Sequence, residues 1–284
     1  MSKKIYPILF AIGCIIAFVL LHQIFAGNLI LPQSFILGPI TIHYYGIVMA
    51  AAAAAGFYLA LKRAAEYRIN SKEAEDLIFW LIIGGFVGAR LYHVLSLFGY
   101  YSAHPAEIIQ VWNGGLSIYG AIIGGFLTLG LHQRLSTKHL ALSTLLDWLT
   151  PSLLIGQIIG RFGNLFNYEA FGYPTSLPWK MFVPPQFRPF DYHQFNFFHP
   201  FFLYEAAGNA IILFLILKII KPKAPGCLFF SYLLLYNILR FALEFLRLDS
   251  TFAYGIRINA VISLLLLPIS ISALLYLKNY AQKP

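Results

Sequence analysis

Charged residues are scarce in this chain. Only 11% of its 284 residues are Asp, Glu, Lys or Arg, whereas 59% are hydrophobic and the mean hydropathy is +0.72. Soluble domains average about 25% charged residues, and a soluble protein could not hide this much apolar surface. The composition therefore excludes a soluble enzyme and a disordered basic chain, and it predicts an integral membrane protein.

Cysteine and acidic residues are also rare. The two cysteines, Cys14 and Cys227, both lie in apolar runs, which argues against a disulfide framework and against a cysteine-based metal site. The chain holds 11 acidic residues against 20 Lys and Arg, with no D-x-x-D pair. Metal-dependent head-group transfer needs several carboxylates around Mg²⁺. We therefore predict no metal and no other cofactor.

Eight apolar stretches are each about long enough to cross a bilayer as a helix. They are 5–26, 43–61, 76–97, 116–133, 140–160, 199–218, 225–246 and 258–277. Five prolines and many aromatic residues fill 162–198, which predicts a folded loop there. The sequence thus predicts an all-α fold, a polytopic membrane helix bundle.

The basic residues predict the orientation of this bundle. Thirteen of the 20 fall at the chain ends and in alternate connections, whereas 27–42 and 98–113 contain none. Cytoplasmic loops carry an excess of Lys and Arg. We therefore expect both termini inside and the loop 162–198 outside.

Seven basic residues are not explained by topology. They are Arg90, Arg161, Lys180, Arg188, Arg240, Arg247 and Arg257. Ionisable groups at membrane depth are costly and suggest a functional site. For Arg257 and Lys180 we favour the simpler explanation that a long side chain reaches from a helix end towards water.

The densest polar cluster is the run Gly160–Gly172, which contains Arg161, Asn164, Asn167 and Glu169 after an apolar helix. Glycine permits close approach of the backbone to a ligand. Arginine offers a planar fork of donors that matches a phosphate. A capped helix end with a satisfied Arg–Glu pair is the alternative, but so many polar groups at membrane depth indicate a site.

A second cluster contains Arg240, Glu244 and Arg247. On a helix this spacing places all three on one face, where Glu244 could pair with both arginines and leave one positive charge. A structural ion triad and an anion site both remain open at this point.

Four smaller clusters are His43–Gly46, Gly88–His93, Trp112–Ala121 and His199–Glu205. In the predicted topology most clusters lie near the outer leaflet, which suggests one site for an anionic lipid head group. A transporter would place its site near the midplane and show repeated halves, and we see no internal repeat. A non-catalytic lipid-binding scaffold remains open.

The run Gly160–Gly172 resembles the signature of the bacterial prolipoprotein diacylglyceryl transferase family. Five further segments also resemble that family and occur in the same order along the chain. They are Tyr45–Gly46, Gly114–Ser117, Pro174–Trp179, the His199–Glu205 segment and the Arg240–Glu244–Arg247 group. The resemblance covers about 40–280 and implies a domain of seven helices. Residues 1–26 then look like an additional N-terminal anchor helix.

The resemblance implies transfer of the diacylglyceryl group of phosphatidylglycerol to the lipobox cysteine thiol of a preprolipoprotein, the first step of lipoprotein maturation. A thioether forms and glycerol-1-phosphate leaves. It also implies a multi-pass protein of the bacterial cytoplasmic (inner) membrane with its site towards the outer leaflet. We expect a membrane-embedded monomer with these lipid and peptide partners and no nucleic acid.

The predicted site residues fall into two groups. The expected catalytic residues are Tyr45, Tyr119, Arg161, Glu169 and Arg240. The expected substrate-binding residues are His43, Arg161, Asn164, Asn167, Gly172, His199, Glu244 and Arg247. Tyr119 stands where well-studied members have a histidine, and a tyrosine with a pKa near ~10 is a poor base at neutral pH. His43 is an alternative base candidate, although we favour a packing role for it.

Overall fold

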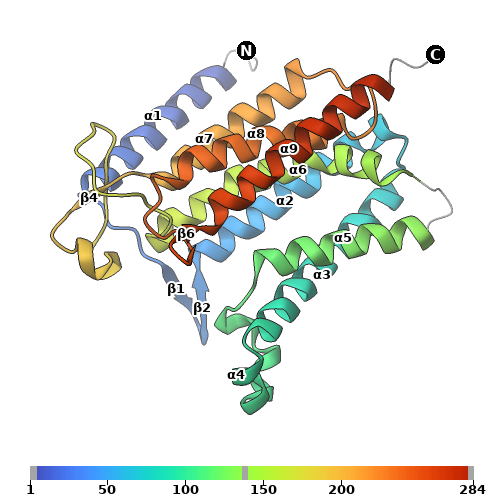
Figure 1. Ribbon diagram of the computed structural model, residues 1–284. Coiled ribbons are helices and arrows are strands. Elements are labelled where there is room, and N and C mark those ends of the chain that lie inside the picture. Colours follow the sequence, from blue (N-terminus) through green and yellow to red (C-terminus); the bar gives the residue numbers. More distant parts are fainter. Residues whose placement is uncertain (1–4, 136–139, 281–284) are drawn as a thin grey trace. The chain divides into compact units, whose positions relative to one another are not determined.

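The computed structural model describes residues 5–135 and 140–280, which form helices joined by short hairpins and loops (Figure 1). The α-helices are α1 (Ile5–Ala26), α2 (Tyr44–Ala64), α3 (Ser71–Ser96), α4 (Phe98–Ala103), α5 (Ile118–Leu135), α6 (Leu142–Asn167), α7 (Phe201–Phe214), α8 (Cys227–Glu244) and α9 (Ile258–Tyr280). A π-helical turn, Leu215–Ile219, extends α7. The 3₁₀ helices are Ala65–Tyr67, Pro105–Ile109, Val111–Asn113, Pro185–Phe187 and Phe190–Tyr192.

Three antiparallel hairpins connect these helices. They are β1 (Ser34–Leu37) with β2 (Ile40–His43), β3 (Met181–Phe182) with β4 (Phe197–Phe198), and β5 (Phe252–Ala253) with β6 (Ile256–Arg257). Every predicted span contains a helix, and six helical segments in the described chain are long and apolar enough to cross a membrane. The predicted all-α polytopic fold is confirmed. Helices α1 and α5 match the other two predicted spans, and their crossing of the membrane stays a prediction.

Two predicted boundaries are wrong. Helix α6 continues to Asn167, so the signature residues 160–167 form its last two turns, and the loop predicted to begin at 162 begins after Asn167. Leu165 is buried and keeps this end packed, and the helix stops where Tyr168 takes a left-handed φ of 51°. Helix α8 ends at Glu244, before the predicted end at 246.

The described residues pack as two compact units. Unit 1 takes its residues from Met1–Ala55, Leu153–Lys221 and Phe230–Tyr276. Unit 2 takes its residues from Gly56–Ser152, Pro222–Phe229 and Leu277–Pro284. The proposed division into an anchor at 1–26 and a domain at 40–280 stays a prediction.

Unit 2 has its core around the fully buried side chains of Leu77, Leu145 and Trp148. The indole Nε1 of Trp148 donates to the carbonyl O of Ala60 at 2.9 Å. The buried Asp147 carboxylate accepts the backbone N–H groups of Gly226 (2.7 Å) and Phe229 (2.8 Å) at the start of α8. These are donors that the first turn of a helix leaves unsatisfied, so Asp147 caps α8 from another helix.

Helices α3 and α5 lie side by side in unit 2 (Figure 1), and glycines allow the close approach of their backbones. A Cβ atom on Gly88 would collide with the carbonyl O of Gly120 and lie 2.9 Å from Cα of Gly124. Small residues serve this purpose in membrane helix pairs, where van der Waals contact drives association.

Substituting Gly88→Ala should therefore force the two helices apart. Overpacking a well-packed contact costs about 1–3 kcal/mol, so thermal unfolding in detergent should begin at a lower temperature. Gly85→Ala is the matched control, because a Cβ there would lie 3.7 Å from the O of Ala121, an ordinary contact. Equal melting temperatures for the two variants would contradict this account of the packing.

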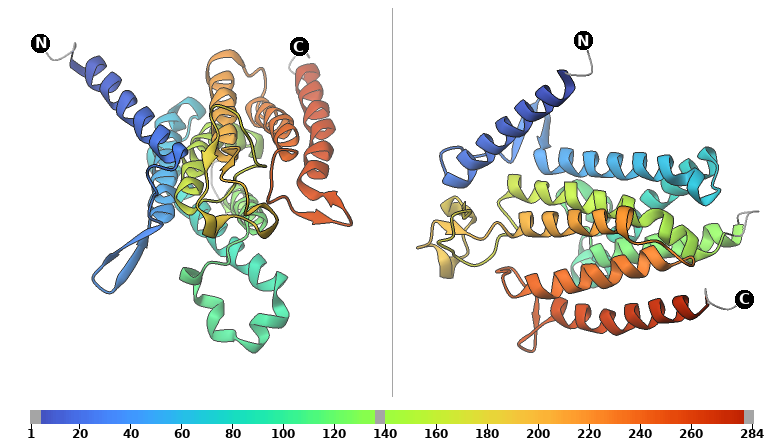
Figure 2. Two further views of the ribbon diagram at one scale, coloured as in Figure 1. Left: turned by 90° about the vertical axis from the view of Figure 1, so that its left-hand side faces the viewer. Right: turned by 90° about the horizontal axis from the view of Figure 1, so that it is seen from above.

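Unit 1 has a second core that holds the loop after α6. The buried Met181, Val183 and Phe198 of this loop pack with Phe202 at the start of α7. The Tyr168 hydroxyl accepts the N–H of Leu31 at 2.6 Å and ties the segment after α1 to the end of α6. Figure 2 shows the loop, in yellow, at the end of α6 and the beginning of α7. It thereby fixes the ends of these helices, which carry the predicted site.

Candidate active site

Three helices of unit 1 bring two arginines to one buried glutamate. The Glu205 side chain of α7 is only 3% exposed. Its Oε2 lies 3.0 Å from Nε of Arg161 on α6, and its Oε1 accepts Nη1 of Arg240 on α8 at 3.4 Å. Glu205 belongs to the predicted cluster His199–Glu205, but it was not among the predicted site residues. An acid within an apolar helix was the signal that could have found it.

Arg240 also contacts a second buried carboxylate. Its Nη2 lies 2.8 Å from Oε2 of Glu244, one helical turn later, and the Glu244 side chain is 0% exposed. Asn259 donates its Nδ2 to the other oxygen of Glu244 at 3.4 Å. Two arginines and two glutamates make this network formally neutral. Arg161 has the more exposed side chain of the two arginines, at 27% against 9% for Arg240.

The predicted triad is wrong in its third member. Because α8 ends at Glu244, Arg247 is not one helical turn further along the same face. Its Nε and Nη2 instead bind the Asp249 carboxylate, at 2.5 and 3.0 Å. The Arg247 guanidinium still lies 5.8 Å from the Phe201 ring centroid, the same distance as the Arg240 guanidinium.

The helix-end explanation for Arg257 and Lys180 is also wrong. Nη1 of Arg257 donates to the carbonyl O of Glu244 (2.8 Å) and to Oγ of Ser250 (2.7 Å), and its Nη2 donates to the Tyr173 hydroxyl (3.1 Å). Arg257 therefore holds the end of α8. Lys180 lies in the loop, with its Nζ 4.4 Å from the Phe197 ring centroid.

The signature residues gather at the end of α6. Asn164 and Asn167 both donate to Oε1 of Glu169, at 3.1 and 3.2 Å. Glu169 is exposed, so its carboxylate meets the surroundings rather than the buried network. Tyr45, at the start of α2, lies within electrostatic range of Glu169 and Arg161. A Cβ on Gly163 would lie 2.9 Å from the Tyr45 ring, which explains the glycine there.

Gly172 joins two segments of the site. Its N–H donates to the carbonyl O of His199 at 2.9 Å, and it forms a β-bridge with Arg247. A Cβ at this position would collide with the carbonyl O of Leu246. The structure thus gives Gly172 a packing reason, and its predicted contact with substrate stays a prediction.

His199 stands at the entry to α7. Its Nδ1 lies 3.0 Å from the hydroxyl of Tyr204, which also accepts Nε1 of Trp179 at 2.7 Å. Burial lowers the pKa of the His199 imidazole below its ordinary value of 6.5. The imidazole is therefore neutral at pH 7.

Arg90 and Arg188, two more of the seven basic residues that topology did not explain, hydrogen-bond to backbone carbonyl groups. The Arg90 guanidinium in unit 2 donates to the carbonyl oxygens of four residues, which are Glu107, Ile108, Gly114 and Gly115, at 2.6 to 3.0 Å. Arg188 donates its Nε to the carbonyl O of Val183 at 2.7 Å. Each arginine holds a loop in shape.

Tyr119 and His43 are not placed in the network. Tyr119 belongs to unit 2, where its ring centroid lies 6.1 Å from that of Tyr92. His43 ends β2 opposite Ser34 with an exposed side chain. Their predicted roles stay predictions.

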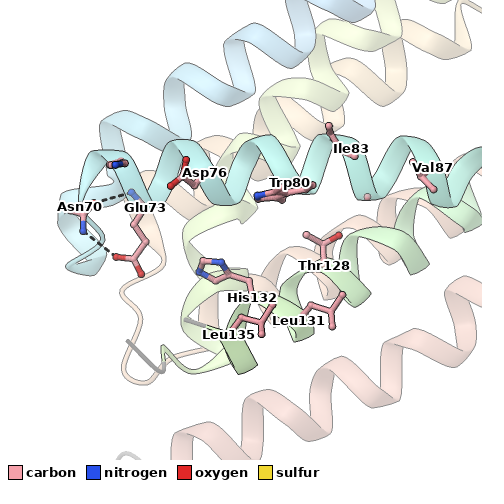
Figure 3. Close-up of a pocket in the computed structure, with 12 residues that line it drawn as sticks. Asn70, Glu73, Asp76, Trp80, Ile83, Val87, Thr128, Leu131, His132 and Leu135 are labelled. Carbon is pink, nitrogen blue, oxygen red and sulfur yellow. Dashed lines mark hydrogen bonds between the residues drawn. The ribbon is translucent and has the colours of Figure 1, made fainter. Parts of the chain in front are cut away.

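A groove between α3 and α5 in unit 2 contains none of the predicted site residues (Figure 3). Its volume is about 1040 Å³. Trp80, Ile83 and Val87 line one wall and Thr128 and Leu131 the other, as Figure 3 shows. In the part of the chain that the structure describes, no cluster of His, Cys, Asp and Glu has the makings of a metal site.

Glu205 and Glu169 should differ in what they do for stability. Glu205→Gln leaves Arg161 and the buried Arg240 with one fewer carboxylate, and removing one partner of a buried ion pair costs about 3–5 kcal/mol. Its melting temperature in detergent should therefore fall sharply. Glu169→Gln, at an exposed position, should change the melting temperature little. A small, equal shift in both variants would refute the central role of Glu205.

The neutral His199 predicts a pH dependence of stability. Because its pKa is lower in the folded protein than in the unfolded chain, the unfolded chain binds more protons below about pH 6.5. The contribution of His199 to stability is complete above that pH and falls as the pH drops. Thermal unfolding between pH 7.5 and 5 should therefore show a steeper loss for the wild type than for His199→Gln. Parallel curves would contradict this.

The fold and this site define a class of protein, a polytopic helical membrane protein with an arginine–glutamate network around the buried Glu205. The model of one family, described as prolipoprotein diacylglyceryl transferase, matches residues 32–276. The chain belongs to this family, and it is a transferase.

Relatives in several bacteria align over most of the chain. A phosphatidylglycerol--prolipoprotein diacylglyceryl transferase of Acaryochloris marina is 42% identical over 249 residues, which are 87% of this chain and 90% of the relative. A protein of the same name in Thermotoga maritima is 37% identical over 291 residues, covering 100% of this chain and 99% of the relative. A third, in Trichormus variabilis, is 40% identical and covers 85% of this chain and 87% of the relative.

Proposed function

We propose that this protein transfers the diacylglyceryl group of phosphatidylglycerol to the lipobox cysteine of preprolipoproteins, the first step of lipoprotein maturation. The observation that carries the proposal is the network in which Arg161 and Arg240 share Glu205. The names of the relatives support the two substrates.

The reaction is a displacement at carbon. The thiolate sulfur of the peptide attacks C3 of the diacylated glycerol, and a C–S bond forms. The C3–O bond to the phosphate breaks, and its electron pair leaves with glycerol-1-phosphate. The leaving phosphate gains negative charge in the transition state, and fixed positive donors stabilise such charge.

The two arginines have different tasks. Arg240 is held between Glu205 and Glu244 and is nearly buried, so it keeps the network in place. Arg161 is the more exposed and carries the guanidinium that meets the phosphate. A planar guanidinium can bind two phosphate oxygens at once. Asn164 and Asn167, which hold Glu169, complete the lipid site with Gly172, His199 and Arg247.

The thiol must lose its proton before attack, because a free cysteine has a pKa near ~8.5. The exposed Glu169 carboxylate, which lies within electrostatic range of Tyr45, is our candidate to receive this proton. Tyr45 then orients the substrate. His43 is the alternative base.

We further propose that the protein works as a monomer in the bacterial inner membrane, with its site towards the outer leaflet. The supporting observation is the distribution of Lys and Arg among the connections. Helix α1 acts as an added anchor before the family domain.

Purified protein, phosphatidylglycerol vesicles and a lipobox peptide should suffice for thioether formation, measured by mass spectrometry. Arg161→Ala should lower kcat/KM by about 10²–10³-fold, as loss of a transition-state donor does. Arg240→Ala should also lower kcat/KM, because it removes the partner that holds Glu205 and Glu244 in the network. Arg134→Ala, at an exposed arginine at the end of α5, is the matched control and should retain activity.

Three outcomes would count against the proposal. A folded wild-type protein that leaves the peptide unmodified would overturn the transfer reaction. Binding of phosphatidylglycerol without transfer would favour a lipid-binding scaffold. Near wild-type rates for both arginine variants would show that the site is elsewhere.

A further inference from the structure

A second polar layer lies one helical turn beyond the arginine–glutamate network. Each residue of the network has a polar residue four positions further into its helix. Arg161 is followed in this way by Gln157 on α6, Glu205 by Asn209 on α7, and Arg240 by Tyr236 on α8. Four residues of helix rise about 6 Å. Because Arg161 and Arg240 both contact Glu205, we infer that the three deeper residues lie at about one level.

Hydrogen bonds join part of this layer to the network. The Arg161 guanidinium donates to the hydroxyl of Tyr236. Gln157 donates its Nε2 to the hydroxyl of Tyr232 at 2.9 Å. The ring centroids of Tyr232 and Tyr236 lie 5.5 Å apart. The layer is therefore a continuation of the arginine site into the helices.

Two oxygen atoms in this layer are left without a donor. Within the described chain, Oδ1 of Asn209 and Oε1 of Gln157 are buried and accept no hydrogen bond. Asn209 is only 1% exposed. A buried acceptor without a partner is destabilising, because it has given up its hydrogen bond to water and gained none in the protein. Two such acceptors at one level next to a phosphate site indicate a ligand or water that donates to them.

The chemistry of the layer selects an uncharged donor. Its side chains, Gln157, Asn209 and Tyr236, are all neutral, and so is Tyr232, which lies one turn further along α8. The two nearby carboxylates are already engaged by arginines. An ammonium head group would therefore be buried without a counter-charge, which is costly. Hydroxyl groups can donate to both oxygens without this cost.

We propose that Gln157 and Asn209 form a hydroxyl pocket that receives the free hydroxyls of the glycerol head group and selects phosphatidylglycerol among anionic phospholipids. This inference rests on the proposed function, since it presumes that the phosphate binds at Arg161. With the phosphate there, the head group extends one turn further and reaches both acceptors.

The test compares two lipids of equal charge. Phosphatidylethanol carries the same phosphodiester but no hydroxyl. Phosphatidylethanol can be measured as a competitor of phosphatidylglycerol, and its inhibition constant is defined even if its own diacylglyceryl group is also transferred. For the wild type this constant should exceed the KM for phosphatidylglycerol by about 10- to 100-fold, because a site built for a hydroxyl rejects the analogue that lacks it.

Asn209→Leu and Gln157→Met remove the acceptor oxygens and keep the side-chain size. Each should raise the KM for phosphatidylglycerol towards the inhibition constant of phosphatidylethanol, which itself should stay unchanged. Asn237→Leu is the matched control, since this buried asparagine donates to the carbonyl O of Leu233 in its own helix. The control should keep the wild-type ratio.

Equal constants for the two lipids in the wild type would mean that water alone fills the layer and would overturn the inference. A parallel change of both constants in the variants would also overturn it, because the residues would then be structural only. Failure of the proposed function is distinguishable, since the folded wild type would then transfer nothing from phosphatidylglycerol.

Discussion

The site depends on one physical constraint, which is that Glu205 is buried with its charge. A carboxylate at membrane depth is tolerated only with a cation beside it, and here α6 and α8 each supply one. Arg161 and Arg240 are costly there without Glu205, and Glu205 is costly without them. Three helices are therefore held together by mutual neutralisation. In the proposed reaction, the lipid phosphate meets this set of charges already assembled.

Because the network is formally neutral, it should bind an anion differently from a cluster of unpaired arginines. A cluster of unpaired arginines would attract a phosphate strongly in the ground state, but tight ground-state binding does not accelerate the reaction. In the proposed reaction, arginines that already pair with carboxylates would respond mainly to the additional negative charge that develops as the phosphate leaves. The carboxylates also hold both guanidinium groups in a fixed orientation, so the proposed chemical step needs little reorganisation.

Much of the fold was predictable from sequence, because a membrane span is a local property of about 20 apolar residues. Arg161 and Arg240 could be singled out as candidate site residues from the sequence, because a charged residue within an apolar stretch is easy to recognise. Glu205 was visible in the sequence, but its partners lie on other helices and no local pattern names them. The assignment of Arg247 to the face of α8 was wrong because periodicity does not show where a helix stops. Gly172 and Arg257 depend on backbone contacts with distant residues, which spacing along the chain does not encode.

The cap that Arg257 places on α8 has an electrostatic consequence. The C-terminal end of a helix carries about half a negative charge, and α6 and α8 both direct that end towards the residues that would bind a phosphate. Left alone, this dipole would disfavour an anion. The Arg257 guanidinium binds the carbonyl O of Glu244 and so offsets the partial charge of α8. Helix α7 begins at the same end and contributes its positive pole, so the helix directions and one distant arginine together prepare the site for an anion.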